Sequence, residues 1–399
     1  MYVRPLRTAM IEGIEKKACT GCSACYSVCP VGAIQMVPDS EGFLYPVSDE
    51  KCIHCKKCLT VCPVKSHKDV DEAFTKKAYA ALTKNRKLWR SSSSGGAFIE
   101  ICKSWEKDNL FIYGATWNGL SVCHTNVHSI EEADKFSKSK YISSEIKDCY
   151  IEIQQHLDNH DNVIFSGTPC QIAGLNSYLR KQYDNLLSID IICHGVGSPK
   201  VFHECIEIIQ DQYNINIKSY GFRHKDYVYR QDHIQSILTE NGEHILIQDD
   251  PYIQLFVQQL CLRKSCEKCL FRSSERYSDI TIGDFKHLDD VFPKLVGGKY
   301  NYSTVILNTK KGESVIKGLK ERMYMYECSI HDIEEYNPAY CFNSDNNHPN
   351  RDAFFVDFIK NPRQAITSIT IPAKKYKISI KRRVFDSLPV WMRKMIVRK

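Results

Sequence analysis

Two cysteine-rich runs near the start of the chain have a spacing that suits iron–sulfur chemistry. The first run, CTGCSACYSVCP, begins at Cys19, and the second, CIHCKKCLTVCP, begins at Cys52. Both runs have the pattern C-x2-C-x2-C-x3-C-P, and each cysteine of the second run lies 33 residues after its counterpart in the first. Cysteines at this spacing bind 4Fe–4S clusters through their thiolates. The pattern therefore predicts electron transfer rather than chemistry on a substrate.

The pattern is that of the bacterial two-cluster ferredoxins, in which the fourth cysteine of each run binds the cluster of the other run. The predicted ligands are Cys19, Cys22, Cys25 and Cys62 for one 4Fe–4S cluster, and Cys52, Cys55, Cys58 and Cys29 for the other. Two structural zinc sites are the alternative. Zinc usually takes two separated pairs of ligands rather than three closely spaced cysteines and a fourth, so clusters are the preferred interpretation.

A further pair of thiols, Cys266 and Cys269 in the stretch SCEKCLFRSS, makes half of a metal site. Residues 162–195 supply partners, because they read as strand, helix and strand, and a crossover of this length favours parallel strands. Cys170 follows the first of these strands and Cys193 ends the second. Both thiols should therefore emerge at the sheet edge where open α/β proteins bind ligands. The positive end of the helix after Cys170 favours a thiolate there.

These four cysteines are enough for a third 4Fe–4S cluster. A zinc site and four ordinary buried cysteines are the alternatives, since burial is common for this residue. Cys261 is a substitute ligand, although it falls in an apolar helical stretch. The remaining cysteines are interpreted as ordinary core residues: Cys102, Cys123, Cys149, Cys205, Cys328 and Cys341.

The segment RSSSSGGAFIEICKSW (90–105) suggests a second kind of site. A Ser/Gly loop that leads into a helix presents backbone amides, hydroxyls and the positive helix end, which together suit a phosphate group. Helix capping by serine, with glycines for close packing, explains the same residues equally well. The stretches SKSKYISS and GFRHKDYVYR add basic groups for an anionic cofactor, or are ordinary solvated surface. The candidate contacts are Ser92, Ser93, Ser94, Gly95, Gly96, Lys138, Lys140 and Arg223.

From about Lys76 the sequence alternates apolar runs with amphipathic segments, which predicts an α/β domain with a mainly parallel sheet. Buried strands are expected at 109–117 and 278–285, in addition to the two strands of the crossover. Helical periodicity covers 199–213, with Ser198 as its N-cap. The predicted domains are an α+β ferredoxin-like unit at 1–75, the larger α/β domain at 76–345 and a basic C-terminal extension at 346–399.

Together these segments resemble the beta-subunit family of coenzyme F420 hydrogenases and dehydrogenases. The resemblance covers some two thirds of the chain and rests on the two ferredoxin runs, SSSSGGAF, SKYISS, GTPCQIAGL, CHGVGSPKVF and the CEKC…SDITIGDF block. It implies a flavin, usually FAD, bound close to an iron–sulfur cluster, and hydride exchange between this flavin and the deazaflavin coenzyme. The resemblance implies that the third set of four cysteines matches the family's cluster ligands. It also implies that the Ser/Gly loop matches a flavin-contacting segment of the family. Thr168, in GTPCQIAGL, is counted with the cofactor contacts.

The expected function is a flavin-dependent iron–sulfur oxidoreductase that moves electrons between a hydride carrier, F420 or a nicotinamide, and a one-electron protein partner. A flavin fits because it accepts a hydride and releases electrons singly. No general acid or base stands out, so the catalytic residues are left unassigned. One departure from the family is Lys286, where many relatives have an aromatic residue after GDF. The alternatives are an electron-transfer subunit without a substrate site, and a reductase that serves surface-polysaccharide biosynthesis.

The composition of the 399 residues, 43% hydrophobic and 25% charged, predicts a cytoplasmic globular protein, since no apolar run is long enough for a membrane span or a signal peptide. Nineteen cysteines in such a chain favour metal clusters over disulfides. Residues 373–399 hold ten Lys or Arg and one Asp, so their net charge is +9. Since the net charge of the whole chain is +7, the other residues carry about −2, which argues against a nucleic-acid surface. We interpret this tail as a solvated end or a partner contact, with a peripheral membrane contact as the alternative.

Overall fold

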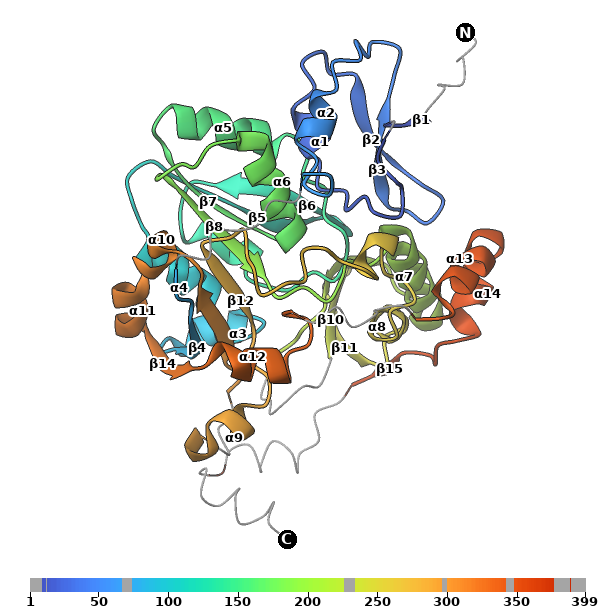
Figure 1. Cartoon of the computed structure of the whole chain (residues 1–399). Coiled ribbons are helices and arrows are strands. Elements are labelled where there is room, and N and C mark those ends of the chain that lie inside the picture. The colour runs from blue at the N-terminus through green and yellow to red at the C-terminus, as the bar shows by residue number, and fades with distance from the viewer. Residues whose placement is uncertain are drawn as a thin grey trace.

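The structure is a computed structural model. It describes residues 9–11, 13–66, 74–225, 234–295, 300–341, 348–376 and 388. Three sheets organise these residues: a small N-terminal sheet, a central sheet of eight strands and a neighbouring sheet of four (Figure 1). Among the described residues, no helix has both the length and the apolar character that a membrane span requires.

The N-terminal domain combines an antiparallel sheet of order β1-β3-β2 with two short helices. Helices α1 (Ala24–Ser27) and α2 (Lys57–Thr60) each contain the third cysteine of one run, and the fourth cysteine follows each helix. The repeat in sequence is also a repeat in backbone geometry, because Ser23 and Lys56, which precede the helices, both have left-handed φ angles, 66° and 59°. An α+β arrangement is thus present. The strands are β1 (Ala9–Met10), β2 (Ile34–Pro38) and β3 (Leu44–Ser48).

The central sheet has the order β14-β4-β13-β12-β8-β7-β5-β6. Its middle strands β12, β8, β7 and β5 run parallel, whereas the pairings on both sides of them are antiparallel. The α/β class is confirmed, but the sheet is mixed rather than mainly parallel. One reason is that Gly119 and Leu120, the two residues between β5 and β6, leave room for a hairpin and not for a crossover. The strands are β4 (Lys77–Thr83), β5 (Leu110–Asn118), β6 (Ser121–Val127), β7 (Asn162–Gly167), β8 (Leu186–Ile191), β12 (Ile280–Asp284), β13 (Ser303–Leu307) and β14 (Met323–Cys328).

The crossover predicted from the sequence is confirmed. Strands β7 and β8 pair in parallel, and α6 (Pro169–Leu179) joins them. The predicted strands at 109–117 and 278–285 correspond to β5 and β12. Helix α7 spans Pro199–Tyr213, and the hydroxyl of its N-cap residue Ser198 accepts a backbone N–H of the first turn at 3.1 Å. The local patterns therefore located these elements correctly.

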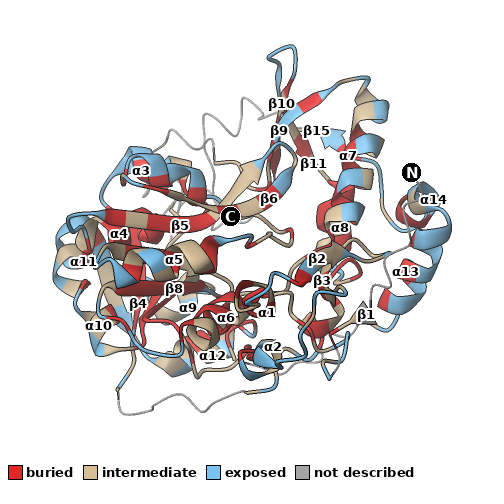
Figure 2. Cartoon of the chain, turned by 90° about the horizontal axis from the view of Figure 1, so that it is seen from above, coloured by how far each residue is buried: buried red, intermediate tan, exposed pale blue. Residues whose placement is uncertain are grey.

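Helices cover both faces of the central sheet, as the view from above shows (Figure 2). On one face, α3, α4, the 3-10 helix η1 and α11 pack against strand residues such as Ile112 and Ile164. On the other face, α5 and α6 pack against Tyr113 and Phe165, the next residue along each strand. The result is a three-layered core. The helices are α3 (Arg86–Ser91), α4 (Ala97–Ser104), η1 (Glu132–Phe136), α5 (Cys149–Asp158), α10 (Lys310–Glu313), α11 (Ile316–Arg322) and α12 (Ile330–Tyr336), with α9 (Leu288–Val291) and η3 (Pro293–Leu295) outside the layers.

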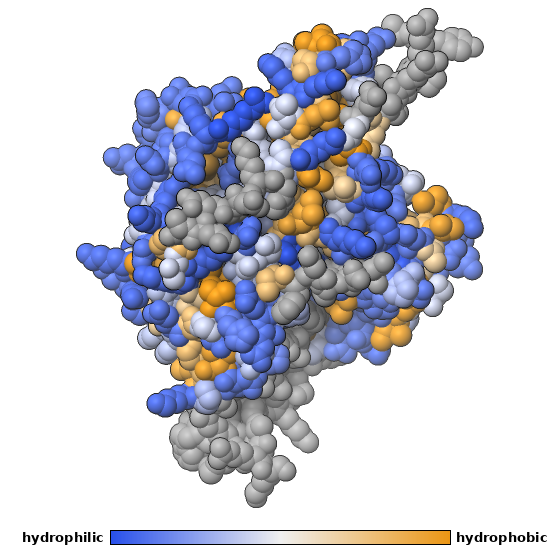
Figure 3. All heavy atoms as spheres, in the orientation of Figure 1, coloured by the Kyte–Doolittle hydropathy of each residue, from blue (hydrophilic) through white to orange (hydrophobic). Residues whose placement is uncertain are grey.

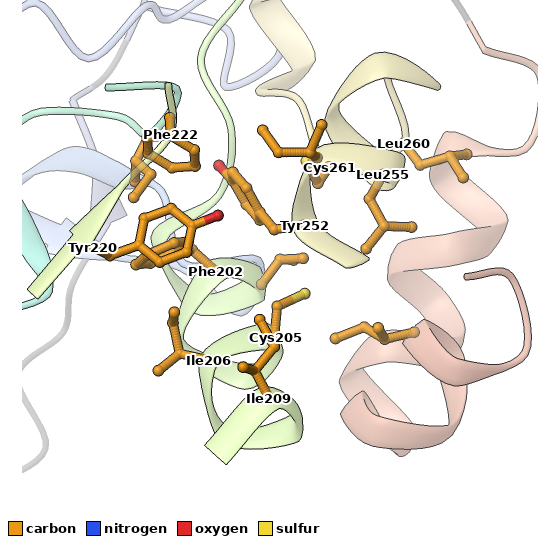
Figure 4. Close-up of a cluster of buried hydrophobic side chains, with 14 of the residues drawn as sticks. Phe202, Cys205, Ile206, Ile209, Tyr220, Phe222, Tyr252, Leu255, Leu260 and Cys261 are labelled. Atoms are coloured by element: carbon orange, nitrogen blue, oxygen red, sulfur yellow. The ribbon is translucent and has the colours of Figure 1, made fainter. Parts of the chain in front are cut away.

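The second, antiparallel sheet has the order β15-β11-β10-β9 and packs with α7, α8, α13 and α14 around a second core, to which Phe43 and Tyr45 of the N-terminal domain and Val122 of β6 also belong. Figure 4 shows side chains of this core, in which Phe202 and Cys205 from α7 lie close to Tyr252 from α8 and to Cys261. Cys205 is an ordinary core residue, as predicted. The elements are β9 (Ile217–Gly221), β10 (Gln235–Thr239), β11 (His244–Gln248), β15 (Lys374–Lys375), α8 (Pro251–Val257), α13 (Arg351–Lys360) and α14 (Pro362–Thr367).

The described start of the basic tail is attached to this second sheet. Ala373 is buried, and the two residues of β15 pair with β11. Residues 377–387 and 389–399, on which the membrane-contact hypothesis depends, lie outside the described residues. On the face seen in Figure 3, hydrophobic residues form separate patches among hydrophilic ones.

The N-terminal domain packs directly onto the α/β part. The tip of its β2–β3 hairpin touches the start of α7, where Ser198 Oγ donates to the backbone oxygen of Glu41, and the Glu41 carboxylate pairs with Arg351 at 2.6 Å. Helix α6 lies against α1, and Gly174 of α6 approaches so closely that a Cβ there would lie 2.9 Å from the Cβ of Cys22. The close approach depends on the missing side chain at Gly174.

Substituting Gly174 therefore tests this domain contact. We expect Gly174→Ala to lower the free energy of unfolding by about 1–3 kcal/mol, because the added methyl overpacks the contact with Cys22. Ser177→Ala, on the same helix and only partly buried, is the matched control and should change stability by less than about 0.5 kcal/mol. Anaerobic thermal denaturation of both variants measures the effect. Equal stability of the two variants would contradict the close packing.

Candidate metal centre and cofactor site

Three cysteines of the first run and the last cysteine of the second line a common pocket. Its lining includes Cys19, Cys22, Cys25 and Cys62, which is the predicted crossed set. All four residues are buried. Burial, with smaller contributions from Cys19 and Cys62, raises the pKa of Cys22 to about 12. Such closely grouped thiols become thiolates when a positively charged metal group offsets the cost of burial.

The second predicted set lies at the surface of the N-terminal domain. Cys55 is exposed, and Cys52 and Cys58 are half-buried. Burial raises the pKa of Cys58, with Cys52 and Cys55 adding to the effect, so these sulfurs are near one another. Cys29 and Cys58 pack against one small hydrophobic cluster, and the Cys29 sulfur accepts the Ala33 N–H at 3.3 Å. The loop of this set is thus the one most open to solvent.

A third group of thiols gathers where the parallel strands end. Cys170 lies in the first turn of α6, directly after β7, and Cys193 follows β8. The 3-10 helix η2 (Lys264–Cys266) and the turn after it bring Cys266 and Cys269 to the same place. All four cysteines line one pocket, which has about 460 Å³ of empty space, part of it open to solvent. The crossover thus supplies the partners that the CEKC pair lacks in sequence.

The chemistry of the lining fits an anionic iron–sulfur cluster. Burial raises the pKa of Cys170, and the other three cysteines of the group raise it further, so the four sulfurs lie within electrostatic reach of one another. Two buried arginines, Arg272 and Arg276, line the same pocket. Their Nε atoms and the Ser265 hydroxyl are buried and, within the described part of the chain, have no hydrogen-bond partner. A cluster in the pocket would accept from such donors.

Two further hydrogen bonds reach the sulfurs of this group. Thr168 Oγ1 lies 3.1 Å from the Cys170 sulfur, and the Gly195 N–H donates to the Cys193 sulfur at 3.4 Å. Thr168, predicted as a cofactor contact, therefore lies beside a thiol. In the described residues, no three Cys, His, Asp or Glu side chains converge closely enough to hold a single metal ion. Cys261 is not part of the pocket lining, because it is buried in the core of Figure 4.

The first and third pockets are neighbours in space. Thr20, which lies between Cys19 and Gly21, lines both of them. The link crosses the boundary between the N-terminal domain and the central sheet, so the packing of one domain on the other brings the two thiol groups together.

The Ser/Gly loop is held by the protein itself. Ser92 Oγ donates to the Leu88 carbonyl at 2.8 Å, and Ser94 Oγ donates to the Tyr302 carbonyl at 2.7 Å. A Cβ at Gly95 would lie 2.2 Å from the Ala81 carbonyl oxygen, and Gly96 is the left-handed N-cap of α4 with φ 87°. These contacts agree with the close-packing role of the glycines, but no serine caps α4, because its N-cap is Gly96 and no side chain bonds to its first turn. The Ser93 hydroxyl accepts the N–H of Ser139, which brings the SKSK stretch alongside the loop.

The predicted cations lie in three different surroundings. Arg223 pairs with Asp284 at 2.7 Å, so much of its charge is balanced. Lys138 is exposed, whereas burial, with Lys138 adding to it, lowers the pKa of Lys140 to about 7. Lys225 was not singled out from the sequence. Burial lowers its pKa to about 7 as well, and its Nζ donates to backbone oxygens of Trp89 and Ser94.

The electrostatic effect of Arg223 extends to His194, beside the third thiol pocket. Burial lowers the pKa of His194, the residue after Cys193, to about 4, and the charges of Lys286, Arg272 and Arg223 lower it further. The polar group that contains Arg223 and Asp284 therefore lies beside the pocket of the third set. Sequence reasoning missed Arg272, Arg276 and Ser265, although the first two stand in FRSSER, directly after the CEKC pair, where clustered arginines were a usable signal.

Fold and thiol groups together define an iron–sulfur protein of the electron-transferring oxidoreductase type. Residues 18–66 match the family model of the 4Fe-4S dicluster domain. Residues 160–333 match the model of the C terminus of the beta subunit of coenzyme F420 hydrogenase/dehydrogenase. The chain is thus similar to the coenzyme F420 hydrogenase/dehydrogenase beta-subunit family over residues 160–333 and to the dicluster domain over residues 18–66, and the resemblance inferred from the sequence is confirmed.

One solved structure is distantly similar to this chain. A chain of the F420-reducing [NiFe] hydrogenase complex from Methanosarcina barkeri, studied as a xenon derivative, is 14% identical, with a TM-score of 0.42. The match covers 74% of this chain and 90% of that one. No curated protein matches the chain.

The pocket of the third set leads to a direct test of the predicted third cluster. We expect Cys266→Ala to remove about four irons per chain and to leave about eight, because the N-terminal clusters have their own ligands. Cys261→Ala is the matched control, since Cys261 is a buried cysteine of the same segment that lies outside the pocket. Iron quantitation after anaerobic purification measures the difference. An unchanged iron content in Cys266→Ala would exclude the third cluster.

Proposed function

We propose that the chain is a flavin-dependent iron–sulfur oxidoreductase that moves electrons between a hydride carrier, coenzyme F420 or a nicotinamide, and a one-electron protein partner. The observation that carries the proposal is the third thiol pocket, in which two arginine Nε atoms have no hydrogen-bond partner among the described residues, directly beside a group of half-buried cations. A bound flavin would accept a hydride and release its two electrons one at a time. This chemistry needs a metal group and an anion-binding group side by side.

The residues proposed to hold iron are the twelve cysteines of the three sets, four for each 4Fe–4S cluster. Donors from Thr168, Ser265, Arg272 and Arg276 support the thiolates of the third set. Hydrogen bonds and positive charges around such sulfurs favour the reduced cluster, because reduction adds negative charge.

The proposed flavin contacts begin with two half-buried lysines. Lys140 and Lys225 lie in surroundings that lower their pKa values to about 7, so an anionic group would stabilise their charged forms. Arg223 holds the Asp284 carboxylate in position and orients the end of β12. Lys286 adds a cation where many relatives have an aromatic residue, which changes the electrostatics next to any bound hydride carrier.

A second candidate function is an electron-transfer subunit without a substrate site of its own. One specific observation favours it: the hydroxyls of Ser92 and Ser94 are engaged by backbone carbonyls, and Arg223 is balanced by Asp284. Under this alternative the chain binds clusters but no flavin.

Flavin content and donor choice separate these functions. We expect anaerobically purified protein to contain about one flavin and about twelve irons per chain. Its flavin should be bleached by reduced F420 or by a reduced nicotinamide, because a hydride carrier is the proposed two-electron partner. Absorbance spectra with each donor, and with reduced ferredoxin as the comparison, measure the outcome. Protein with its full iron content and no flavin would support the electron-transfer subunit instead.

Lys140 allows a pH test of the flavin contact. Its pKa of about 7 means that the charged form becomes scarce as the pH rises from 7 to 9, so FAD affinity should fall over that interval. Lys140→Gln should weaken FAD binding at pH 7 about tenfold and flatten the pH dependence, because it removes one charge-assisted hydrogen bond. Lys138→Gln is the matched control from the exposed neighbouring position. Fluorescence titration of the deflavinated protein with FAD measures both, and the same pH profile in Lys140→Gln and wild type would exclude Lys140 as a contact.

A further inference from the structure

A buried arginine from the α/β part contacts one of the cysteines that line the first thiol pocket. Arg263 stands three residues before Cys266, and about 1% of its surface is exposed. Its Nε donates to the Cys19 backbone oxygen at 2.8 Å, and its Nη2 donates to the Leu44 backbone oxygen at 3.0 Å. The same Nη2 lies 3.9 Å from the Cys19 sulfur. Arg263 thus connects the segment of the third set to a cysteine of the first.

Two aromatic rings and a glycine of the N-terminal domain surround this guanidinium. Arg263 lies over the ring of Tyr45 at 4.2 Å and near that of Phe43 at 5.5 Å. Gly21, in the first cysteine run, has a left-handed φ of 72°, and a Cβ there would lie 3.0 Å from Nη1 of Arg263. A side chain at position 21 would therefore push the guanidinium away. The equivalent position of the second run is occupied by the exposed His54, which also has a left-handed φ, 53°.

The positive charge of Arg263 needs a negative partner, because an unpaired buried charge is costly. The two carboxylates of the β2–β3 hairpin are engaged elsewhere: Asp39 pairs with Lys16 at 2.7 Å, and Glu41 pairs with Arg351 at 2.6 Å. The described contacts of Arg263 itself are backbone oxygens, aromatic rings and the Cys19 sulfur. Burial raises the pKa of Cys266 and the charge of Arg263 offsets part of that rise, so this charge reaches the third set as well. The sulfur that the guanidinium contacts directly is that of Cys19, so the first set is the thiolate group beside which this cation is placed.

We propose that Arg263 is a positioning residue that raises the reduction potential of the cluster held by Cys19, Cys22, Cys25 and Cys62, and so draws electrons from the third set into the N-terminal domain. The inference rests on the proposed iron–sulfur sites. Reduction adds one electron to the first cluster as the third loses one, and a nearby cation stabilises the added charge. Thr20 lines both pockets, and Arg263 contacts Cys19, the residue before it, so the charge lies next to the boundary between the two sites.

The test is an anaerobic redox titration of the full chain, followed by electron paramagnetic resonance. We expect Arg263→Gln to lower the midpoint potential of one cluster by at least about 59 mV. For a one-electron couple this shift corresponds to a tenfold change in the equilibrium constant of reduction. Arg263→Lys, which keeps the charge but loses the paired geometry, should shift it less. Lys264→Gln is the matched control, because Lys264 pairs with Glu267 and Asp352 and should leave all midpoints unchanged.

Repeating the titration in a Cys266→Ala background assigns the shift. The shift should persist there, because the first and second clusters remain when the third is lost. Unchanged midpoints at full iron content in Arg263→Gln would overturn the proposal. Loss of about four irons in both Arg263→Gln and Arg263→Lys would also overturn it, since the arginine would then serve packing alone. Absence of flavin would refute the proposed function. It would not affect the test of Arg263, because that test measures the midpoint potentials of the N-terminal clusters.

Discussion

Burying groups of cysteine sulfurs beside one another is the constraint on which the rest of the structure depends. Grouped thiolates repel one another and lose hydration, so each buried group needs cations and hydrogen-bond donors from its surroundings. Beside the first set, Arg263 of the α/β part donates to the Cys19 backbone oxygen and lies 3.9 Å from the Cys19 sulfur. For the third set, Arg272 and Arg276 line the pocket, and their Nε atoms have no protein partner in the described part of the chain. Much of the domain contact follows from this need.

Helix α6 connects the two buried groups. Its first turn carries Cys170 of the third set, and one turn later Gly174 packs against Cys22 of the first. Since the helix is fixed at its start by β7 and the thiol pocket, its placement against α1 also fixes the N-terminal domain. The hairpin contact of Glu41 with Arg351 provides a second anchor away from the helix. A shift of either domain would disturb both thiol groups together.

The sequence predicted much of this arrangement because its strongest signals are local. The spacing of the two runs named the set that lines the first pocket, and the strand–helix–strand pattern brought Cys170 and Cys193 to one edge. The mixed character of the sheet could not be predicted from the sequence. Strands β13, β4 and β14 join the sheet as antiparallel neighbours, and their pairings connect segments that are distant in the chain. Arg263 was missed for a related reason: its role depends on a glycine and two aromatic rings more than 200 residues away in sequence. The serine hydroxyls were overrated as ligand groups, since their carbonyl partners cannot be inferred from the loop itself.

Exposure gives the proposed electron path a direction in space. The first set is buried, the third lies beside the cations of the proposed flavin site, and the second contains the exposed Cys55. Under the proposed function, electrons would therefore pass between the third set and the second set, across the domain boundary near Thr20 and Arg263. The loop of that set also exposes Ile53, with Lys51, Lys56 and Lys57 around it. An apolar residue surrounded by lysines suits an acidic one-electron carrier, because complementary charge speeds encounter while the apolar contact holds the partner close. Under the proposed function, the relay would thus connect the third set, beside the proposed flavin site, with the second set at the surface of the N-terminal domain.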